Sequence, residues 1–592
     1  MKCAVAGIAL LVVQISPASA QSVDLSPGRW PAAVRERLEA REAAIRPAGI
    51  RELRGSGGIV SATMSPVAAH AGAEVLRKGG TAADAAIATA LTQVTMMAGA
   101  NVSFAGAAQV LYFDARKIRV YALDAGWNGW SGERQPASIP AADVGMLTGA
   151  TVASAGAAGR KTLVPGFMAG LEALHDRFGR TRWGALFDPA IWYAERGIPV
   201  TPLLAAYFDM ARAPLARTAA GKAFLMPSGA NPPKIGDRFA PTGLAGTLRA
   251  VARNGAKEMY IGDWGRRFVA AVRDQGGAAS LADMAAYRPG WTRALTAEFA
   301  GGRVHLPDPA NPSGCAMAMA LNVVAHADAG RRYWQDAAAL RTLALVLRMA
   351  IAAPYLPQVA ALERELGTGA GCQVRAGARF GAAAAERLDT LAGIAPAALG
   401  EHHTATVVAV DRWGNVAALV HSSNTLIWGD SGMVVGGVPI PMAAGIYQQR
   451  LATIAPGGRL PSDMAPLMLL RGGRPVVAIA GAGTSVVPES VRLMMGFSRG
   501  ERMADWLAAP PLLLNFEQAG QPLAHQDELI PADAYPPRVL DLLRAMNFRF
   551  RTIDAQRVSV LRGTVAAVRL GAGGIREAAE VPEVQAFTEK AE

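Results

Sequence analysis

Two β-branched, apolar runs around a short polar turn span residues 404–422 and constrain the fold more than any other stretch. The runs 404–410 and 416–422 flank Asp411-Arg412-Trp413-Gly414-Asn415, which is the pattern of a β-hairpin with a glycine-containing loop. If Val410 pairs with Val416, Thr404 lies opposite Ser422 at the open end. This pairing predicts either a nucleophile with a supporting hydroxyl or two ordinary strand residues, because β-branched threonine favours strands.

Outside the hairpin, the chain alternates short apolar strands with helices. Strand patterns occupy 57–63, 109–123, 303–306 and 476–480, and helix patterns occupy 66–78, 82–90, 167–178 and the residues after 488. Residues 331–400 are rich in Ala and Arg and predict further helices. Strands with helices on both sides predict a layered α/β (α+β) architecture.

Residues 1–20 carry the pattern of a secretory signal peptide. A short positive start is followed by an apolar stretch from 4 to 15 and by Ala18-Ser19-Ala20, a small-x-small cleavage pattern. The alternative is an N-terminal membrane anchor, but the apolar stretch is shorter than the about 20 residues that a membrane span requires. We therefore expect an exported protein, periplasmic or secreted, whose mature chain starts near Gln21 and has no membrane span.

The basic excess of the chain is spread along the sequence. There are 59 Lys and Arg against 47 Asp and Glu, without a dense basic tract interleaved with aromatic residues, so nucleic-acid binding is not supported. A solvated basic surface is the first interpretation, and attraction for anionic substrates is the second. Removal of the signal peptide leaves Cys315 and Cys372, either as one disulfide or as two buried thiols.

Glycine and histidine patterns limit the chemistry. The loop Gly481-Ala482-Gly483-Thr484-Ser485 follows a strand, lacks a nucleotide-binding fingerprint, and suits an oxyanion instead. His402, His403 and His421 converge near the hairpin ends, but without a carboxylate or cysteine at metal-ligand spacing, so a metal-dependent hydrolase is a weaker alternative that a chelator would test. The sequence lacks the Gly-x-Ser-x-Gly elbow of serine hydrolases. We expect neither a metal nor another cofactor.

A nucleophile without a partner base arises if Thr404 becomes a chain terminus. A free α-amine has a pKa of about 8. It therefore accepts the proton of its own threonine hydroxyl near neutral pH. A hydrolase of this kind needs neither a catalytic triad nor a metal.

Segments that resemble one known family follow one another from about residue 57 to 500. Gly79-Gly80-Thr81-Ala82-Ala83-Asp84-Ala85-Ala86 resembles the Gly-Gly-Asn-Ala-x-Asp-Ala-Ala segment of gamma-glutamyltransferases. Later segments resemble further landmarks of that family, in the same order: Val164-Pro165-Gly166, Pro189-Ala190 with Ala194 and Gly197, Asn311-Pro312-Ser313-Gly314, Asp411-x-x-Gly414-Asn415, and Leu460-Pro461-Ser462-Asp463-Met464-Ala465-Pro466. The resemblance fades after about residue 505.

The resemblance implies an N-terminal-nucleophile hydrolase with a four-layer αββα sandwich, made as one precursor. Autocatalytic cleavage between His403 and Thr404 would separate a large segment, 21–403, from a small segment, 404–592, and the two would stay together as a heterodimer. Thr404 would be the nucleophile and Ser422 the hydroxyl that supports it. The other implied site residues are Asn424, Ser462 and Asp463 for the substrate and Gly483 and Thr484 for the oxyanion.

The substrate that the family implies is a γ-glutamyl amide such as glutathione, cleaved by water or by an acceptor amine. Three positions depart from the family pattern: Gly126 replaces the arginine that binds the donor carboxylate, Ile440 replaces the acidic residue that holds the α-amino group, and Thr406 replaces a histidine. A compensating group would come from Arg134, Arg160 or Asp463. The departures leave two alternatives open, a hydrolase of a non-glutamyl amide (oxamate-like or acylated) and a catalytically inactive exported binding protein.

Overall fold

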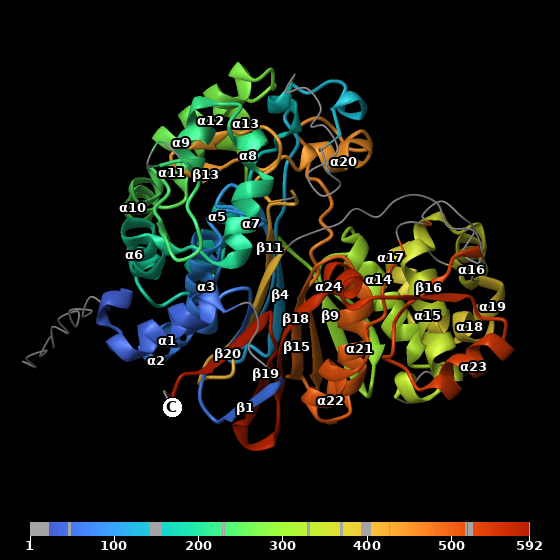
Figure 1. The fold of residues 1–592 in the computed structure, drawn as a ribbon. Coiled ribbons are helices and arrows are strands. Elements are labelled where there is room, and N and C mark those ends of the chain that lie inside the picture. Colours follow the sequence, from blue (N-terminus) through green and yellow to red (C-terminus); the bar gives the residue numbers. More distant parts are fainter. Residues whose placement is uncertain are drawn as a thin grey trace, which may run out of the picture.

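Two antiparallel seven-stranded sheets form the centre of the molecule (Figure 1). The computed structural model describes residues 23–590 except 45–48, 142–156, 228, 230, 328–331, 368–370, 392–403, 426, 516–517 and 519–524. The predicted signal peptide and the residues His402 and His403 therefore lie outside the described residues.

The strands of each sheet come from distant parts of the chain. The first sheet contains, in spatial order, β20 (Val584–Thr588), β2 (Ile59–Thr63), β10 (Ala405–Val410), β11 (Val416–Ser422), β3 (Ala107–Asp114), β4 (Arg119–Ala125) and β7 (Gly290–Thr292). The second sheet contains β1 (Arg51–Gly55), β19 (Arg576–Glu580), β18 (Thr564–Leu570), β15 (Arg474–Ala482), β14 (Leu467–Arg471), β9 (Gly302–Leu306) and β8 (Leu295–Phe299).

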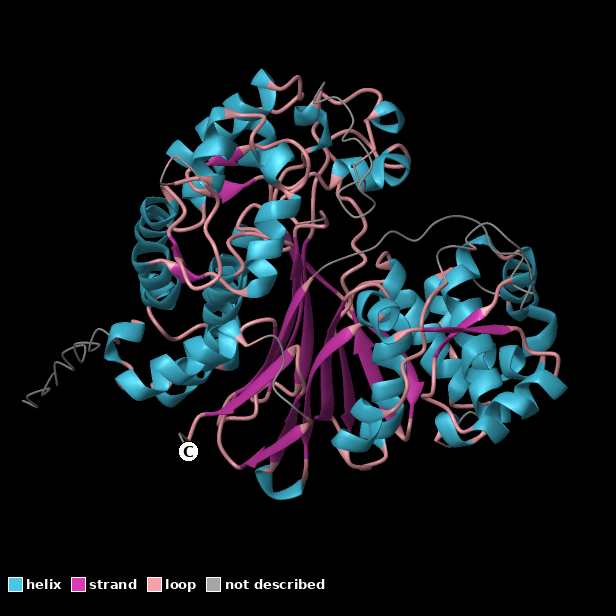
Figure 2. Cartoon of the chain, in the orientation of Figure 1, coloured by secondary structure: helices cyan, strands magenta, loops and turns pink. Residues whose placement is uncertain are grey.

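Helices cover the outer face of each sheet, and the inner faces pack against each other (Figure 2). The side chains of β10 alternate accordingly: Val407 and Ala409 pack with the helices, whereas Val408 and Val410 pack with the second sheet. Successive side chains of a strand point to opposite faces of the sheet, so a strand between two packed layers must alternate in this way. The predicted four-layer αββα sandwich is confirmed.

Each helical layer has a few helices in direct contact with its sheet. On the first sheet these include α2 (Pro66–Arg77), α3 (Ala82–Met96) and α5 (Phe167–Phe178), and on the second they include α14 (Pro312–Val324) and α21 (Val486–Ser498). One helix outward, α6 (Asp188–Arg196) packs on α3, and α15 (Ala337–Ala352) packs on α14. Further helices surround the first layer: α1 (Ala32–Ala43), α7 (Pro202–Met210), α8 (Arg212–Leu215), α9 (Ala219–Leu225), α10 (Leu244–Asn254), α11 (Lys257–Tyr260), α12 (Asp263–Asp274), α13 (Leu281–Ala286) and α20 (Ala444–Leu451). The remaining helices are α16 (Pro357–Leu366), α17 (Cys372–Arg375), α18 (Ala378–Glu386), α19 (Leu388–Leu391), α22 (Met503–Ala508), α23 (Pro537–Ala545) and α24 (Ala555–Leu561). Three short strand pairs complete the structure: β5 (Ile198–Pro199) with β6 (Arg238–Phe239), β12 (Val434–Val435) with β13 (Val438–Pro439), and β16 (Glu528–Pro531) with β17 (Phe550–Ile553).

The helix starts at Ser65 and Thr81 follow the sequence prediction. Ser65 Oγ accepts a hydrogen bond from the backbone N–H of Ala68 at 3.1 Å, and Thr81 forms a reciprocal capping box with Asp84. Such caps satisfy N–H groups that have no partner within the helix. The Asp84 carboxylate also accepts from the backbone N–H groups of Arg180 and Thr181, so one buried side chain ties α3 to the residues after α5.

Cys315 and Cys372 form a disulfide. Cys315 lies in α14 and Cys372 begins α17, and their Cα atoms are 5.4 Å apart. This resolves the alternative that the sequence leaves open. The bond joins two helices of the outer layer on the second sheet.

One helical segment among the described residues, Ala337–Tyr355, has the length and hydropathy of a membrane span, which differs from the sequence expectation that no such stretch exists. Most of this segment is buried inside the protein. Leu340, Leu343 and Leu347 all belong to the core under the second sheet. Its apolar character therefore follows from its place between other helices.

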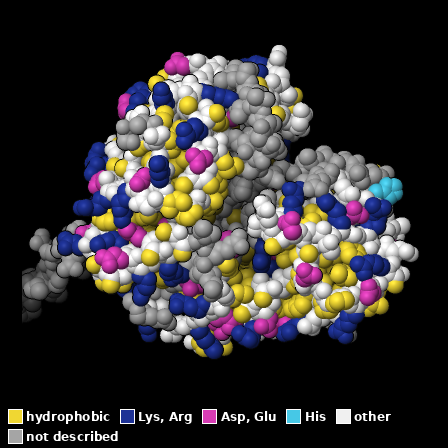
Figure 3. Space-filling model, in the orientation of Figure 1, with side chains coloured by type: hydrophobic (Ala, Val, Ile, Leu, Met, Phe, Trp, Pro, Cys, Tyr) yellow, Lys and Arg dark blue, Asp and Glu magenta, His cyan; other side chains and the backbone are white. Residues whose placement is uncertain are grey.

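The last strands of the chain complete both sheets, although no pattern in the sequence predicts them. β18 pairs with β15, β19 joins β18 to β1, and β20 forms the edge of the first sheet beside β2. Residues after 505 are therefore integral to the sandwich. On the surface, Lys and Arg are scattered among acidic and apolar side chains over the face drawn in Figure 3, as the spread of basic residues along the sequence predicts.

Candidate active site

The hairpin pairs as the sequence predicts. β10 and β11 are antiparallel, with Val410 opposite Val416 and Ala405 opposite His421, so the next pair outward is Thr404 and Ser422. Thr404 Oγ1 donates to Ser422 Oγ at 3.4 Å, and both residues are buried. Two hydroxyls therefore meet at the open end of the hairpin.

The closed end of the hairpin is held by its turn. Gly414 has φ +86°, a conformation that favours glycine. The Asp411 carboxylate accepts hydrogen bonds from the backbone N–H of Ala82 at 3.0 Å and from the Asn415 side chain at 2.7 Å. Because Ala82 is the first residue of α3, two segments of the family resemblance are in contact here and fix the hairpin on the helical layer.

Asn424 links the supporting hydroxyl to two aromatic side chains. Its backbone N–H donates to Ser422 Oγ at 2.9 Å. The indole N–H of Trp127 donates to Asn424 Oδ1, and the Asn424 amide donates to the Tyr447 hydroxyl, both at 3.0 Å and both buried. Trp127 and Tyr447 are not among the site residues that the sequence predicts. The one signal for Trp127 is its place directly after Gly126, where a family landmark is altered.

Asp463 and Arg450 form an ion pair beside Tyr447. Arg450 Nη1 lies 2.9 Å from Asp463 Oδ2, and its guanidinium is 4.9 Å from the centre of the Tyr447 ring. Burial, followed by the charge of Asp463, raises the pKa of Tyr447 well above its usual value, so the hydroxyl stays protonated at neutral pH. Asp463 thus joins the network of Asn424 through Tyr447, whereas Ser462 Oγ accepts from the nearby Met464 N–H at 3.2 Å.

Arg459 lies beside Gly126. A Cβ at residue 126 would be 2.8 Å from Asp124 Oδ1 and 3.5 Å from Arg459 Cδ. The Arg459 guanidinium pairs with the Asp124 carboxylate at 3.2 Å, donates to Asn128 Oδ1 at 2.7 Å, and lies over the Tyr287 ring. A cation is therefore present near residue 126, but its hydrogen bonds are directed to protein groups. In the sequence, Arg459 is marked only by its position immediately before the family segment 460–466.

Of the three residues proposed to compensate for Gly126, two are in ion pairs and one is exposed. Arg160 pairs with Glu133 at 2.8 Å, Asp463 pairs with Arg450, and Arg134 is exposed.

Ile440 is fully enclosed, with 1% of its surface exposed. It belongs to the core cluster that contains Met433 and Met442, and its backbone N–H donates to the Met433 carbonyl at 3.0 Å. An acidic side chain here would be buried among apolar groups, which is costly unless the charge is paired. The surroundings of residue 440 are therefore built for an apolar side chain.

Gly483 and Thr484 lie on the loop from β15 to α21. Gly483 has φ +95°, and a Cβ there would lie 3.2 Å from the Arg562 carbonyl oxygen, so the loop conformation favours glycine. At the start of α21, Glu489 accepts hydrogen bonds from Arg492 at 2.7 Å and from Arg562 at 3.3 Å. Within the described ranges this loop makes no hydrogen bond to Thr404, and its oxyanion role stays a prediction.

His421 points to the helical layer. Its Nε2 lies 2.9 Å from Gln93 Oε1, its ring is 5.1 Å from that of Phe167, and burial lowers its pKa to about 3. His421 is therefore neutral at physiological pH and supports the strand. In the part of the chain that the structure describes, no group of three or more His, Cys, Asp or Glu side chains is placed to hold a metal ion.

The arrangement offers a buried threonine hydroxyl at the start of a strand, with a second hydroxyl and a fixed amide beside it. A threonine oxygen attacks a carbonyl carbon when a base removes its proton. The α-amine of Thr404 takes that role only after the preceding peptide bond is cut. Thr404 and Ser422 lie at the open end of one hairpin, and Asn424 lies in the loop that follows it.

Comparisons with known proteins point to one family. A family model described as gamma-glutamyltranspeptidase matches residues 68–582, so the resemblance extends beyond residue 505. The Acylase ACY 1 proenzyme of Pseudomonas sp. (strain V22) is 28% identical over 449 residues, which cover 72% of this chain and 77% of that protein. The glutathione hydrolase proenzyme of Pseudomonas aeruginosa is 27% identical over 556 residues, covering 88% and 93%. The crystal structure of cephalosporin acylase from Bacillus halodurans shares the fold, with a TM-score of 0.73 and 20% identity over 92% of this chain and 98% of that chain.

Proposed function

The chain belongs to the gamma-glutamyltranspeptidase family and is an N-terminal-nucleophile hydrolase, and on that premise we propose the reaction that it carries out. It is a self-processing amidohydrolase or acyltransferase that forms an acyl-enzyme on Thr404. Its substrate is a small amide whose acyl group is not γ-glutamyl.

Self-processing is the first step of the proposal. Thr404 Oγ1 attacks the carbonyl carbon of His403, the hydroxyl proton passes to the Thr404 nitrogen, and the peptide bond breaks to leave an ester and a free amine. Water then hydrolyses the ester, which releases the carboxylate of His403. Thr404 becomes a new N-terminus with its own base.

Turnover uses the same oxygen. As Oγ1 attacks the amide carbonyl, the Thr404 amine accepts the hydroxyl proton and later gives it to the leaving nitrogen. Backbone N–H groups at Gly483 and Thr484 are proposed to stabilise the oxyanion. Water, or an acceptor amine, then attacks the ester and releases the acyl group.

The observation that carries this proposal is the hydrogen bond from Thr404 Oγ1 to Ser422 Oγ, with Ser422 itself held by the Asn424 N–H. The position of Thr404 directly before β10 supports it further, because a cut there severs no strand. Both sheets contain strands from before and after residue 404, so the two fragments would remain bound as a heterodimer. The names of both relatives include the word proenzyme, which agrees with processing.

The substrate class is inferred from the groups around Asn424. A γ-glutamyl donor carries a carboxylate and an ammonium, and both need charged partners when they are buried. Here the Arg459 and Asp124 charges pair with each other, as do Arg450 and Asp463, and Ile440 is apolar. A neutral acyl group needs no such partners, and the similarity to an acylase supports this choice.

A γ-glutamyl amide is the second candidate. It is favoured by the glutathione hydrolase relative, which aligns with 88% of this chain. In that case one of the two ion pairs would have to open to bind the donor.

The test is a panel of anilides that share one leaving group. We expect release of aniline from simple acyl anilides at least tenfold faster, as kcat/KM, than from the γ-glutamyl anilide, and a faster γ-glutamyl reaction would favour the second candidate. A hydroxyl-reactive covalent probe separates both candidate enzymes from an inactive binding protein. We expect the probe to label Thr404 in the small fragment. An unlabelled Thr404, together with no turnover of any anilide, would contradict the proposal.

Export to the periplasm or medium is proposed on the signal-peptide pattern alone.

A further inference from the structure

Trp127 lies at the outer end of a chain of hydrogen bonds that leads to Thr404. Its indole N–H donates to Asn424 Oδ1 at 3.0 Å. The Asn424 backbone N–H donates to Ser422 Oγ at 2.9 Å, and that oxygen also accepts from Thr404 Oγ1 at 3.4 Å. All four residues are buried, with exposed fractions of 7% or less. A side chain from the segment before residue 404 is therefore connected to the proposed nucleophile through protein groups alone.

Asn424 is in a backbone conformation that needs support. Its φ is +47°, in the left-handed region, which is unfavourable for residues that carry a Cβ and is tolerated best by asparagine and aspartate. Both ends of its side-chain amide are held, because Oδ1 accepts from Trp127 and Nδ2 donates to the Tyr447 hydroxyl at 3.0 Å. The indole N–H only donates, so a reversed amide would place two donors against each other. The side-chain bonds therefore fix the residue whose backbone N–H holds Ser422.

Trp127 is itself held firmly. Its carbonyl accepts from the Leu460 backbone N–H at 2.9 Å, and the next residue, Asn128, exchanges two backbone hydrogen bonds with Val164, at 3.2 and 2.9 Å. The Trp127 ring belongs to the buried cluster that contains Leu163. A donor on a rigid, packed segment keeps its partner within a narrow range of positions, which is what a side chain that supports an active site must do.

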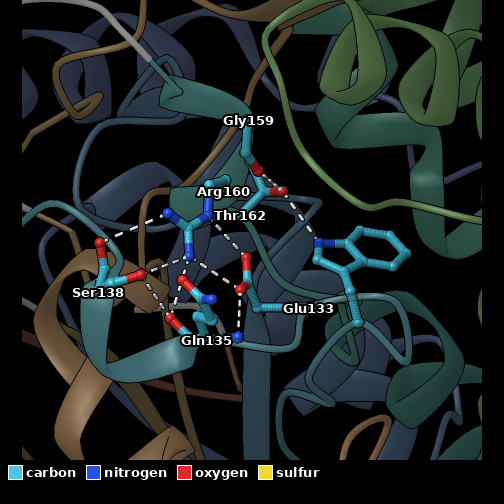
Figure 4. Close-up of polar contacts among 7 residues, drawn as sticks. Glu133, Gln135, Ser138, Gly159, Arg160 and Thr162 are labelled. Carbon is cyan, nitrogen blue, oxygen red and sulfur yellow. Dashed lines mark hydrogen bonds and ion pairs between the residues drawn. The ribbon is translucent and has the colours of Figure 1, made fainter.

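Trp130, three residues later, makes an equivalent hydrogen bond in different surroundings. Its indole N–H donates to Thr162 Oγ1 at 3.1 Å, and Thr162 Oγ1 donates to the Gly159 carbonyl at 2.7 Å. Figure 4 shows Thr162 and Gly159 beside Arg160. Among the described residues, these bonds do not lead to the hairpin. Trp127 and Trp130 are each 3% exposed, so the two indoles are matched in burial and bonding and differ in where the bond leads.

We propose that Trp127 is a positioning residue for the reactions of Thr404: through Asn424, it holds the backbone N–H that fixes the Ser422 hydroxyl. The inference rests on the proposed function and adds to it a residue from the segment before the cut. In this role Trp127 acts through its partner and not on the reacting atoms. It serves both self-cleavage and turnover, because the same Ser422 oxygen contacts Thr404 Oγ1 in both.

The test is Trp127→Phe, which keeps an aromatic ring in the buried cluster and removes the N–H. We expect self-cleavage, followed by pulse-chase on denaturing gels, to slow about tenfold or more, because a displaced supporting group costs rate. On the simple acyl anilides kcat should fall by a similar factor, with KM within about threefold of the wild type, since no substrate contact is removed.

Trp130→Phe is the matched control, because it also removes one buried indole hydrogen bond. Denaturant titration should show a similar loss of stability for the two variants. Self-cleavage and kcat of Trp130→Phe should nevertheless stay within about twofold of the wild type, since its bond does not support the hairpin.

Asn424→Gly shows whether the effect passes through Asn424. Glycine adopts a positive φ without a side-chain anchor, so in this background Trp127→Phe should change self-cleavage and kcat less than about twofold, as expected for two residues that act as one unit. The same comparison decides the case if Trp127→Phe is less stable than its control, because a general loss of stability acts in both backgrounds.

Three results would overturn the inference. The first is an equal effect of Trp127→Phe and Trp130→Phe on the two rates. The second is a loss in the Asn424→Gly background as large as in the wild type. The third is a raised KM with unchanged self-cleavage, which would make Trp127 a substrate contact. Failure of the proposed function looks different, because then the wild-type chain neither cuts itself nor turns over any anilide.

Discussion

The two halves of the candidate site differ in what their polar groups are bonded to. At the hairpin end, hydrogen bonds link Thr404 to Ser422 and Ser422 to Asn424, and these residues follow the family pattern. At the recognition end, near Gly126 and Ile440, charged groups are closed into ion pairs or replaced by an apolar side chain. On the proposed function, the difference means that the reacting groups are kept while the substrate changes, because the two depend on different elements of the fold.

The largest effect is expected for Thr404→Ala. Loss of the nucleophile should prevent cleavage, so that the protein runs as one chain, and should lower turnover by about 10⁴-fold or more. Thr406→Ala is the control, since Thr406 is a buried threonine of the same strand whose hydroxyl contacts Thr63 at 3.4 Å. It should still be cut. A cleaved and active Thr404→Ala protein would show that the hairpin end is not the reacting end.

Ser422→Ala should have the next largest effect. Removal of its hydroxyl leaves Thr404 Oγ1 and the Asn424 N–H without their shared partner, and we expect kcat to fall about 10²-fold, a loss typical of one group in such a network. Denaturing gels over time should also show slower cleavage. Ser423→Ala, which removes a hydroxyl bonded to the Thr425 carbonyl, should change kcat less than threefold. Equal effects of the two variants would remove Ser422 from the catalytic network.

Arg459→Met probes the recognition end. Methionine keeps apolar contact with the Tyr287 ring but removes the partner of Asp124, so we expect the free energy of unfolding to fall by about 2 kcal/mol. Because the proposed substrate does not bind this cation, kcat/KM for simple acyl anilides should change less than fivefold. Denaturant titration and initial rates measure the two quantities. A loss of turnover above about 10²-fold with little change in stability would mean that Arg459 binds substrate.

The last prediction concerns stability and not turnover: His421 is adjacent to Ser422 in sequence but faces the helical layer. Burial lowers its pKa from 6.5 to about 3, so below pH 6.5 the unfolded chain binds a proton that the folded chain does not. The resulting stability is complete above pH 6.5 and is lost as the pH falls towards 3, by about 1.4 kcal/mol per pH unit.

His421→Gln removes that titration. Its free energy of unfolding should therefore decline less steeply than that of the wild type between pH 6 and 4, measured by urea titration at each pH. His326→Gln, at an exposed histidine, is the control. Parallel curves for wild type and His421→Gln would contradict the burial argument.

The parts of this structure that sequence reasoning predicts are those that depend on neighbouring residues. The register that brings Thr404 to Ser422 follows from the loop length between Val410 and Val416, and the caps at Ser65 and Thr81 follow from residues within one helical turn. The four layers follow from the alternation of strands and helices, together with the family resemblance.

The contacts that sequence reasoning misses join distant segments. Trp127 and Asn424 are 297 positions apart, and the ion-paired residues Arg459 and Asp124 are 335 positions apart. No local pattern marks such a pair, since either side chain alone fits an ordinary surface or core position. The strands after residue 505 are missed for the same reason, because β18 gains its place only by pairing with β15.

Sequencing the N-terminus of the smaller fragment of purified wild-type protein tests the role of the hairpin most directly. Cleavage before the nucleophile predicts Thr404 as the first residue, followed by Ala405 and Thr406. The same fragment should be missing from Thr404→Ala. An uncut wild-type chain that hydrolyses amides, or an active fragment that begins at another residue, would contradict the proposal that Thr404 acts through its own α-amine.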